Sequence, residues 1–230
     1  MTTQTFRGLR LTGALVALLL GAAPAAAQLP ANVQDILRRI HTTQEFGAGG
    51  RGPGAGGRWV DGGAGYAAAE RTADGATELV RYDTATGRRD VLLTAAQLTP
   101  PSLGKPLQFS DYAVSAGGRR LLFAAAGRPT MIRKTAYEYW TLDAASGDWR
   151  KLGGPAGEGL LYAKLSPDGT RAAYVRANNL FVEDLRTGAA TALTRDGSPM
   201  IINGASDWVY EEELGLRDAF EWSPDGRRVA

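Results

Sequence analysis

From Trp59 onward, the chain consists of short apolar runs separated by polar turns that contain glycine. Runs such as Leu180-Phe181-Val182-Glu183 show the short-period pattern of β-strands, whose successive side chains point to opposite faces. No strongly periodic helix interrupts them before residues 207–213. The pattern predicts an all-β domain, with the strand-borne tryptophans Trp59, Trp140 and Trp149 in its core.

Two kinds of turn alternate between these runs. One has the form Ser-Pro-Asp-Gly, at residues 166–169 and 223–226, with a degenerate copy at 115–118. The other has the form Asp-x-x-Ser/Thr-Gly, at residues 83–87, 143–147 and 184–188. Proline presets φ, aspartate hydrogen-bonds its own backbone and glycine accepts a positive φ. Each motif is therefore expected to reverse a strand tightly.

The alternating turns divide the chain into repeats over residues 58–98, 108–153 and 159–195, with the start of another at 219–230. Repeats of about 40 to 60 residues with roughly four short strands are typical of β-propeller blades. A closed ring needs at least four blades. We therefore expect a partial β-propeller of about three and a half four-stranded blades. A β-sandwich is the structural alternative, because regular short strands also suit that fold.

The first residues have the pattern of an export signal. Arg7 and Arg10 precede an apolar run over residues 11–23, and Ala25-Ala26-Ala27 offers a cleavage site. A spanning helix needs about 20 apolar residues, so a retained membrane anchor is the less favoured alternative. We expect residues 1–27 to be a signal peptide, and the mature protein to be periplasmic or secreted.

Residues 28–57 are predicted to precede the propeller as a separate segment. Val33, Ile36, Leu37 and Ile40 have helical spacing, which predicts one short helix within residues 31–46. Residues 47–57 are nearly all glycine and are interpreted as a linker. Their match to G-x-G-x-x-G lacks the preceding strand and following helix that dinucleotide binding requires. The β-propeller region is then residues 58–230.

Composition excludes several kinds of site. The chain has no cysteine, one histidine and a formal net charge of +2. Without cysteine the domain must fold on packing alone, and with a single histidine it lacks the usual ligands of a transition metal. Its basic residues are scattered rather than clustered. We expect no metal, no cofactor and no nucleic-acid partner.

An acidic heptapeptide, Asp207-Trp208-Val209-Tyr210-Glu211-Glu212-Glu213, is the most unusual feature of the chain. Like charges repel, so three consecutive carboxylates suggest a cationic ligand. A helical turn brings neighbouring residues within about 100° of each other, whereas a strand separates them. We expect a short helix or turn inserted between strands, with Leu214 and Leu216 anchoring its other side. The alternative is a solvated acidic helix start stabilised by the helix dipole.

The heptapeptide, followed by Trp222-Ser223-Pro224-Asp225-Gly226, resembles the propeller domain of the dipeptidyl peptidase IV family. Ile202-Asn203-Gly204 and the run over residues 132–139 extend the likeness. This family belongs to the prolyl oligopeptidase clan of serine peptidases. The resemblance implies an exopeptidase that releases N-terminal dipeptides after proline or alanine. It also implies that Glu212 and Glu213 bind the substrate's ammonium group, with Arg133 as a further substrate-binding residue.

The chemistry of an ammonium group agrees with this implication. An ammonium carries three donors on one atom, so two convergent carboxylates can each accept one of them. A blocked or internal amine lacks the positive charge. A pair of glutamates would therefore select free N-termini, and the expected partner is a peptide with a free N-terminus.

The catalytic residues of such a peptidase are missing from this sequence. It contains no G-x-S-x-G pentapeptide, and its single histidine, His41, precedes the repeats. We expect the remaining blades and an α/β-hydrolase domain to lie beyond Ala230, and this chain alone to be inactive. Homodimerisation of the full-length protein stays open. So do two alternatives: a non-enzymatic exported propeller that binds peptides or envelope proteins, and a degraded gene product that does not fold.

Overall fold

The computed structural model describes residues 33–35, 57–131, 134–154 and 159–230. The predicted signal peptide, His41, most of the glycine-rich segment and Arg133 lie outside these ranges. Residues 33–35, in the predicted N-terminal helix, are helical. Within the described ranges, no helix has the length and apolar character needed to cross a membrane.

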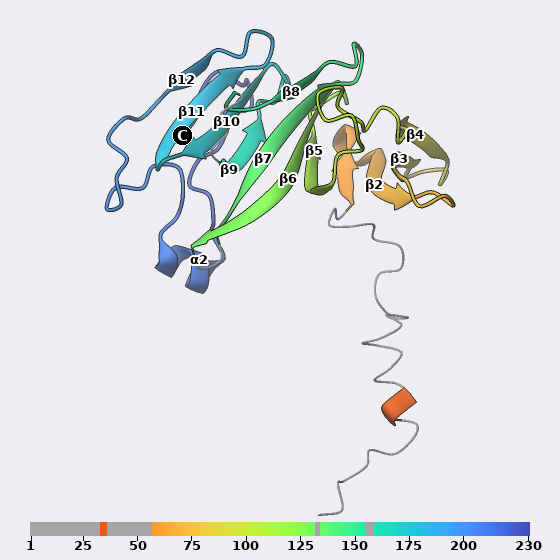
Figure 1. The fold of residues 1–230 in the computed structure, drawn as a ribbon, viewed down its shortest axis with the longest axis horizontal. Helices are drawn as coiled ribbons and strands as arrows, with labels where there is room; N and C mark the ends of the chain where they lie inside the picture. The colour runs from red at the N-terminus through yellow and green to blue at the C-terminus, as the bar shows by residue number, and fades with distance from the viewer. Residues whose placement is uncertain (1–32, 36–56, 132–133, 155–158) are drawn as a thin grey trace, which may run out of the picture. The chain divides into compact units, whose positions relative to one another are not determined.

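The described chain contains three antiparallel four-stranded sheets (Figure 1). The first holds β1 (Arg58–Val60), β2 (Gly65–Arg71), β3 (Thr77–Asp83) and β4 (Arg89–Leu93), with the short 3-10 helix η1 (Asp61–Gly63) after β1. The second holds β5 (Phe109–Val114), β6 (Arg120–Met131), β7 (Lys134–Asp143) and β8 (Trp149–Lys151). The third holds β9 (Leu161–Leu165), β10 (Arg171–Arg176), β11 (Asn179–Asp184) and β12 (Ala190–Ala192).

In each sheet the strands lie side by side in sequence order. After the third sheet come the helix α2 (Trp208–Leu214) and a further antiparallel bridge between Trp222 and Val229. This order confirms the predicted all-β fold and its repeats as propeller-type blades. It excludes a β-sandwich, because three successive sheets replace two sheets packed face to face.

The predicted turn chemistry is present in the turn between β9 and β10. The Gly169 N–H donates to the Ser166 carbonyl oxygen at 2.8 Å, and Gly169 has a φ of 68°. The Asp168 carboxylate accepts the Thr170 N–H at 3.1 Å and bonds the Ser166 hydroxyl at 2.6 Å. The tetrapeptide thus closes locally, which explains why it could be recognised in the sequence.

The strands β6 and β10 are buried on both faces, because each contributes side chains to the cores on either side of its sheet. On β6, Leu121 and Phe123 pack in the core between the first and second sheets. The alternate residues Leu122 and Ala124 pack in the core between the second and third sheets. Because successive side chains of β6 point to opposite faces, this one strand contributes to two hydrophobic cores. Burial of these apolar side chains holds neighbouring blades together.

Arginines next to the turns also join neighbouring blades. Arg120, at the start of β6, donates to the carbonyl oxygen of Gly169 in the next blade at 3.3 Å. Arg171, at the start of β10, donates in the same way to the carbonyl oxygen of Gly226. The arginines that follow the turns at residues 115–118 and 166–169 are thus interblade contacts.

The prediction for the tryptophans holds only in part. Trp140 is buried, and Trp149 packs beside it with ring centroids 6.5 Å apart. Trp59 was predicted to be core, but 71% of its surface is exposed. Its neighbour Val60 packs on the core between the first two sheets, so Trp59 points to the opposite face of β1, where it contacts Tyr66.

Candidate functional site

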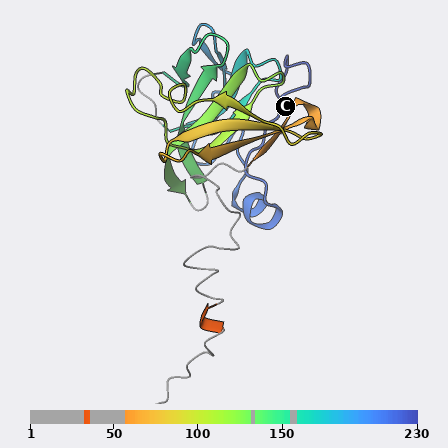
Figure 2. The ribbon, with the colours of Figure 1, turned by 90° about the vertical axis from the view of Figure 1, so that its right-hand side faces the viewer.

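The acidic heptapeptide lies in a loop closed at its base, residues 205–218, here called the α2 segment. Ala205 and Asp218 form an antiparallel bridge. The Ser206 N–H donates to the Arg217 carbonyl oxygen at 3.0 Å. From this base the segment extends beyond the strand ends, as both ribbon views show (Figures 1 and 2). The α2 segment is therefore an insertion between the third blade and the strand pair that follows.

Helix α2 is ended by a cap on each side. The Asp207 carboxylate accepts the Tyr210 N–H at 3.0 Å, which caps the start of the helix. Gly215 ends the helix with a φ of 67°, and its N–H donates to the Tyr210 carbonyl oxygen. The prediction of a short helix inserted between strands is confirmed.

Two lysines from different blades hold the two ends of the α2 segment. Buried Lys134, the first residue of β7, donates through Nζ to the Ser206 carbonyl oxygen at 2.7 Å. Lys164 on β9 forms an ion pair with Asp218 and donates to the Phe220 carbonyl oxygen at 2.8 Å. Burial disfavours the charged form of Lys164. Its hydrogen bonds to Asp218 and Glu221 outweigh this effect of burial, so the pKa of Lys164 is raised. The segment is thus positioned by the second and third blades together.

The three glutamates of the heptapeptide have different surroundings. Glu212 and Glu213, the predicted ammonium-binding pair, are exposed on α2. Glu211 is only 5% exposed, and its Oε1 has no hydrogen-bond partner within the described part of the chain. Successive helical positions differ by about 100°, so one carboxylate faces the protein while its neighbours face outward. The two outward side chains are exposed to solvent.

The predicted anchoring of the helix by leucines is wrong. Leu214 and Leu216 are 63% and 50% exposed, and the aromatic residues Trp208 and Tyr210 are also more than half exposed, at 60% and 52%. The segment extends beyond the sheets, so no described sheet covers these side chains. The residue buried on α2 is instead Glu211.

The third predicted binding residue, Arg133, lies outside the described residues. Its sequence neighbour Lys134 is described, and it bonds Ser206 immediately before the helix cap Asp207. The start of β7 therefore lies next to the α2 segment.

A hollow of about 490 Å³ lies beside the α2 segment. The first strand of each sheet and the end of the α2 segment contribute to it, through Arg58, Asp111, Tyr112, Tyr162, Lys164, Arg217 and Asp218 among others. Its walls thus combine aromatic rings with charges of both signs. Burial, and then the negative charge of Glu211, raises the pKa of Tyr162 to about 12. The phenol stays protonated at neutral pH.

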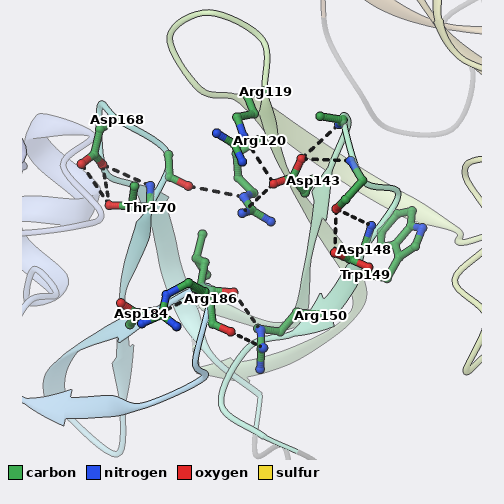
Figure 3. A pocket seen from close by; sticks show the side chains of 14 residues that line it. Arg119, Arg120, Asp143, Asp148, Trp149, Arg150, Asp168, Thr170, Asp184 and Arg186 are labelled. Carbon is green, nitrogen blue, oxygen red and sulfur yellow. Dashed lines mark hydrogen bonds and ion pairs between the residues drawn. The ribbon is translucent and has the colours of Figure 1, made fainter.

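A larger hollow of about 890 Å³ lies between the turns of the second and third blades (Figure 3). Four arginines and four aspartates line it, so its charges balance. The Asp143 carboxylate accepts the Ala145 N–H at 3.0 Å and pairs with Arg120 at 3.1 Å. Arg150 donates to the Leu185 carbonyl oxygen across the gap at 3.0 Å.

In these contacts, the charged side chains of the larger hollow stabilise turns and link the second and third blades. The hollow also lies at the far end of β7, which begins at Lys134 beside the α2 segment and ends at Asp143. We therefore assign it a structural role. In the described residues, no group of three or more histidine, cysteine, aspartate or glutamate side chains is arranged to hold a metal ion.

Sequence reasoning missed three residues of this site: Glu211, Tyr162 and Lys164. Glu211 belongs to the heptapeptide, but which of three adjacent glutamates is buried depends on how α2 is oriented in the folded protein. Lys164 gave a weak signal as a charge inside the apolar run of residues 160–165. Tyr162 gave none, because its surroundings come from segments distant in sequence.

Comparison with known proteins finds similarity in the part of the chain that contains the α2 segment. Residues 115–230 match the family described as the dipeptidyl peptidase IV N-terminal region. A probable dipeptidyl peptidase 4 of Aspergillus fumigatus is 43% identical over 95 residues, which cover 40% of this chain and 12% of that protein. A probable dipeptidyl-aminopeptidase B of Talaromyces stipitatus is 31% identical over 169 residues, covering 70% of this chain and 19% of that protein.

Among solved structures, the crystal structure of Porphyromonas gingivalis dipeptidyl peptidase 4 is similar to the described fold. It superposes with a TM-score of 0.67 at 27% sequence identity. The match covers 86% of this chain and 27% of that chain. The chain thus spans less than a third of the length of each of these relatives.

Proposed function

This chain belongs to the family of the dipeptidyl peptidase IV N-terminal region, and from that premise we propose that it reads the free N-terminus of peptide substrates. It would do so as the propeller portion of an exported serine exopeptidase that releases Xaa-Pro or Xaa-Ala dipeptides. The hydrolysis itself would belong to an α/β-hydrolase domain outside this chain. The export signal pattern of residues 1–27 supports a periplasmic or secreted location.

The exposure of Glu212 and Glu213 on a capped and anchored helix is the observation that carries this proposal. Two carboxylates on adjacent helical positions can converge on one small cation. Lys134 and Lys164 hold the segment that bears them, so less conformational entropy is lost when a ligand binds. A primary ammonium matches this arrangement, because it offers three donors and a full positive charge.

Arg133 would assist from the start of β7. In the proposed role its guanidinium bonds the peptide near a carbonyl group and steadies the acidic pair. The contact of the adjacent Lys134 with Ser206 supports this role, because it holds the start of β7 beside the α2 segment. We also propose two further partners: a C-terminal hydrolase domain, and a second copy of the full-length protein in a homodimer.

A binding experiment on this chain tests the proposal. The tripeptide Ala-Pro-Ala and its N-acetylated form would be titrated into the labelled protein and followed by amide chemical shifts. We expect the free amine to bind at least about tenfold more tightly, because acetylation removes the charge that the glutamates recognise. Glu212→Gln and Glu213→Gln should each remove most of that difference.

The matched control is Glu78→Gln, which removes one negative charge from β3 in the first blade, where Glu78 pairs with Arg89. This variant should bind both peptides as the wild type does. Equal affinity of the wild type for the free and acetylated peptides would overturn the proposed function. In a full-length gene product, the same two variants should lower kcat/KM for free-amine substrates by at least about tenfold.

A further inference from the structure

The outward side of helix α2 carries aromatic as well as acidic side chains. Trp208 and Tyr210 are both more than half exposed, and the exposed Glu212 and Glu213 follow them in the same helix. Tryptophan and tyrosine rings are highly buried on average, because they carry a large apolar surface. Two exposed rings therefore accompany the proposed ammonium-binding pair.

Helix geometry sets which of these side chains are neighbours. Trp208 and Glu212 are four residues apart in α2, and Tyr210 and Glu213 are three apart. Residues at these spacings lie on the same side of a helix, with Cβ atoms about 5 to 6 Å from each other. Helical side chains also lean towards the N-terminus, which brings Glu212 over Trp208. Each carboxylate of the pair thus has an aromatic neighbour.

The buried residue of α2 shows which side of the helix faces outward. Glu211 is 5% exposed, so its direction marks the side that faces the protein. Successive residues differ by about 100°, so Val209 and Glu213 point away from that side. Val209 is accordingly 51% exposed. By the same rotation, five residues follow one another around the outward surface: Trp208, Glu212, Val209, Glu213 and Tyr210.

An ammonium group can bind to aromatic rings as well as to carboxylates. A ring attracts a cation that lies over its face within about 6 Å of the centroid, and tryptophan does so most strongly. This chain already contains such a contact, with the Arg171 guanidinium 5.4 Å from the centre of the Trp222 ring. The attraction depends on the positive charge and not on the number of N–H groups.

We propose that Trp208 and Tyr210 are further ligand-binding residues, whose rings contact the ammonium group held by Glu212 and Glu213, so that the site also accepts N-methylated N-termini. The inference rests on the proposed function. Each methyl group on the nitrogen removes one N–H donor to the carboxylates but leaves the charge. It also adds apolar surface, which the rings and Val209 can cover.

Three forms of one peptide separate charge from hydrogen bonding: Ala-Pro-Ala, its N,N,N-trimethyl form and its N-acetyl form. The trimethyl form keeps the charge without any N–H donor. Its Kd for the wild type should lie between those of the other two, because it keeps the ring contacts and loses the hydrogen bonds. Amide chemical shifts and tryptophan fluorescence follow each titration.

Trp208→Leu should raise the Kd for Ala-Pro-Ala about two- to fivefold, because one cation–π contact is lost. The Kd for the trimethyl form should rise at least as much, and the Kd for the uncharged acetylated form should stay the same. Trp208→Phe keeps a ring and should raise the Kd less. Tyr210→Leu should act in the same direction as Trp208→Leu. Because both side chains are exposed, the urea midpoint should stay near that of the wild type.

Trp59→Leu is the matched control. Trp59 is also an exposed tryptophan, but it lies on the first blade, where its ring contacts Tyr66. This variant should leave the Kd of all three peptides unchanged, and the fluorescence change on binding should persist in it. In Trp208→Leu most of that fluorescence change should be lost, because Trp208 is the tryptophan that contacts the ligand.

Four outcomes would overturn the inference. If the wild type prefers the free amine and Trp208→Leu and Tyr210→Leu change no Kd, the rings do not contact the ligand and the proposed function stands alone. If Trp208→Leu weakens all three peptides equally, its ring contacts the peptide without recognising the charge. If the trimethyl form binds no better than the acetylated form, N–H donors are required and methylated N-termini are excluded. If the wild type does not prefer the free amine, the proposed function fails and this inference fails with it.

Discussion

At the scale of single residues, the aspartates of the repeated turns show how local chemistry supports the fold. Asp168 bonds the Ser166 hydroxyl and accepts the Thr170 N–H. These hydrogen bonds, the one to Ser166 foremost, favour the ionised form and lower the pKa of Asp168. Because the folded-state pKa lies below the value of about 3.9 in an unfolded chain, ionised Asp168 stabilises the fold above that pH.

This linkage predicts a pH dependence of stability. The stabilisation from Asp168 should be lost as the pH falls through its folded-state pKa. Asp168→Asn should therefore make the fall in unfolding free energy between about pH 5 and pH 2 shallower. Urea unfolding at a series of pH values measures this slope. Asp90→Asn, which removes the same charge from an exposed pair with Arg88, should leave the slope close to wild type. A wild-type slope in both variants would contradict the role of the turn.

At the scale of elements, the α2 segment depends on close packing where it leaves the third blade. Gly204 lies just before its base, with a φ of 75°. Its carbonyl oxygen accepts the Ala219 N–H at 3.1 Å, which joins the chain just before the α2 segment to the chain just after it. A Cβ at this position would lie 2.8 Å from Val175 Cγ2 and 3.3 Å from Leu180 Cδ1. Glycine is required there for both backbone and space.

Gly204→Ala should therefore destabilise the chain by about 2 to 4 kcal/mol, from backbone strain together with overpacking. It should also weaken binding of Ala-Pro-Ala, because the base of the α2 segment shifts. Urea unfolding and the peptide titration measure the two effects. Gly215→Ala is the control: it has a similar φ of 67° but open space around its Cβ. It should cost only about 1 kcal/mol. Equal losses in the two variants would show that packing at Gly204 does not matter.

At the scale of the whole molecule, the blades share their cores strand by strand. Adjacent residues of β6 belong to different cores, Leu121 to the one with the first blade and Leu122 to the one with the third. Arg120 and Arg171 add polar contacts between successive blades. The described residues from Gly57 onward accordingly belong to one compact unit. Such shared cores favour unfolding in a single transition.

Leu121→Ala and Leu122→Ala, both at nearly fully buried positions, should each lower the unfolding free energy by about 2 to 5 kcal/mol. Both should act on the same cooperative transition, with an m-value like that of the wild type. Circular dichroism during urea unfolding measures both quantities. Two separate transitions, each shifted by only one of the variants, would mean that the blades unfold independently.

Much of this architecture could be predicted because its signals are local. The turn motifs at residues 166–169 and 184–188 close on themselves through their own side chains, so they are recognisable in any fold. The strand pattern between them follows from the same spacing. The helix at residues 208–214 was also predictable, since Asp207 and Gly215 cap it from within the same short segment.

The rest depends on contacts between segments that are distant in the sequence. Trp59 has the pattern of a core residue, yet it points to a face of β1 that no described sheet covers. Leu214 and Leu216 are exposed, while Glu211 is buried. The sequence by itself determined the turns, the blades and the acidic helix. Only the tertiary structure decided which glutamate is buried and that Tyr162 lines the hollow beside the α2 segment, because burial and partners are set by neighbouring blades.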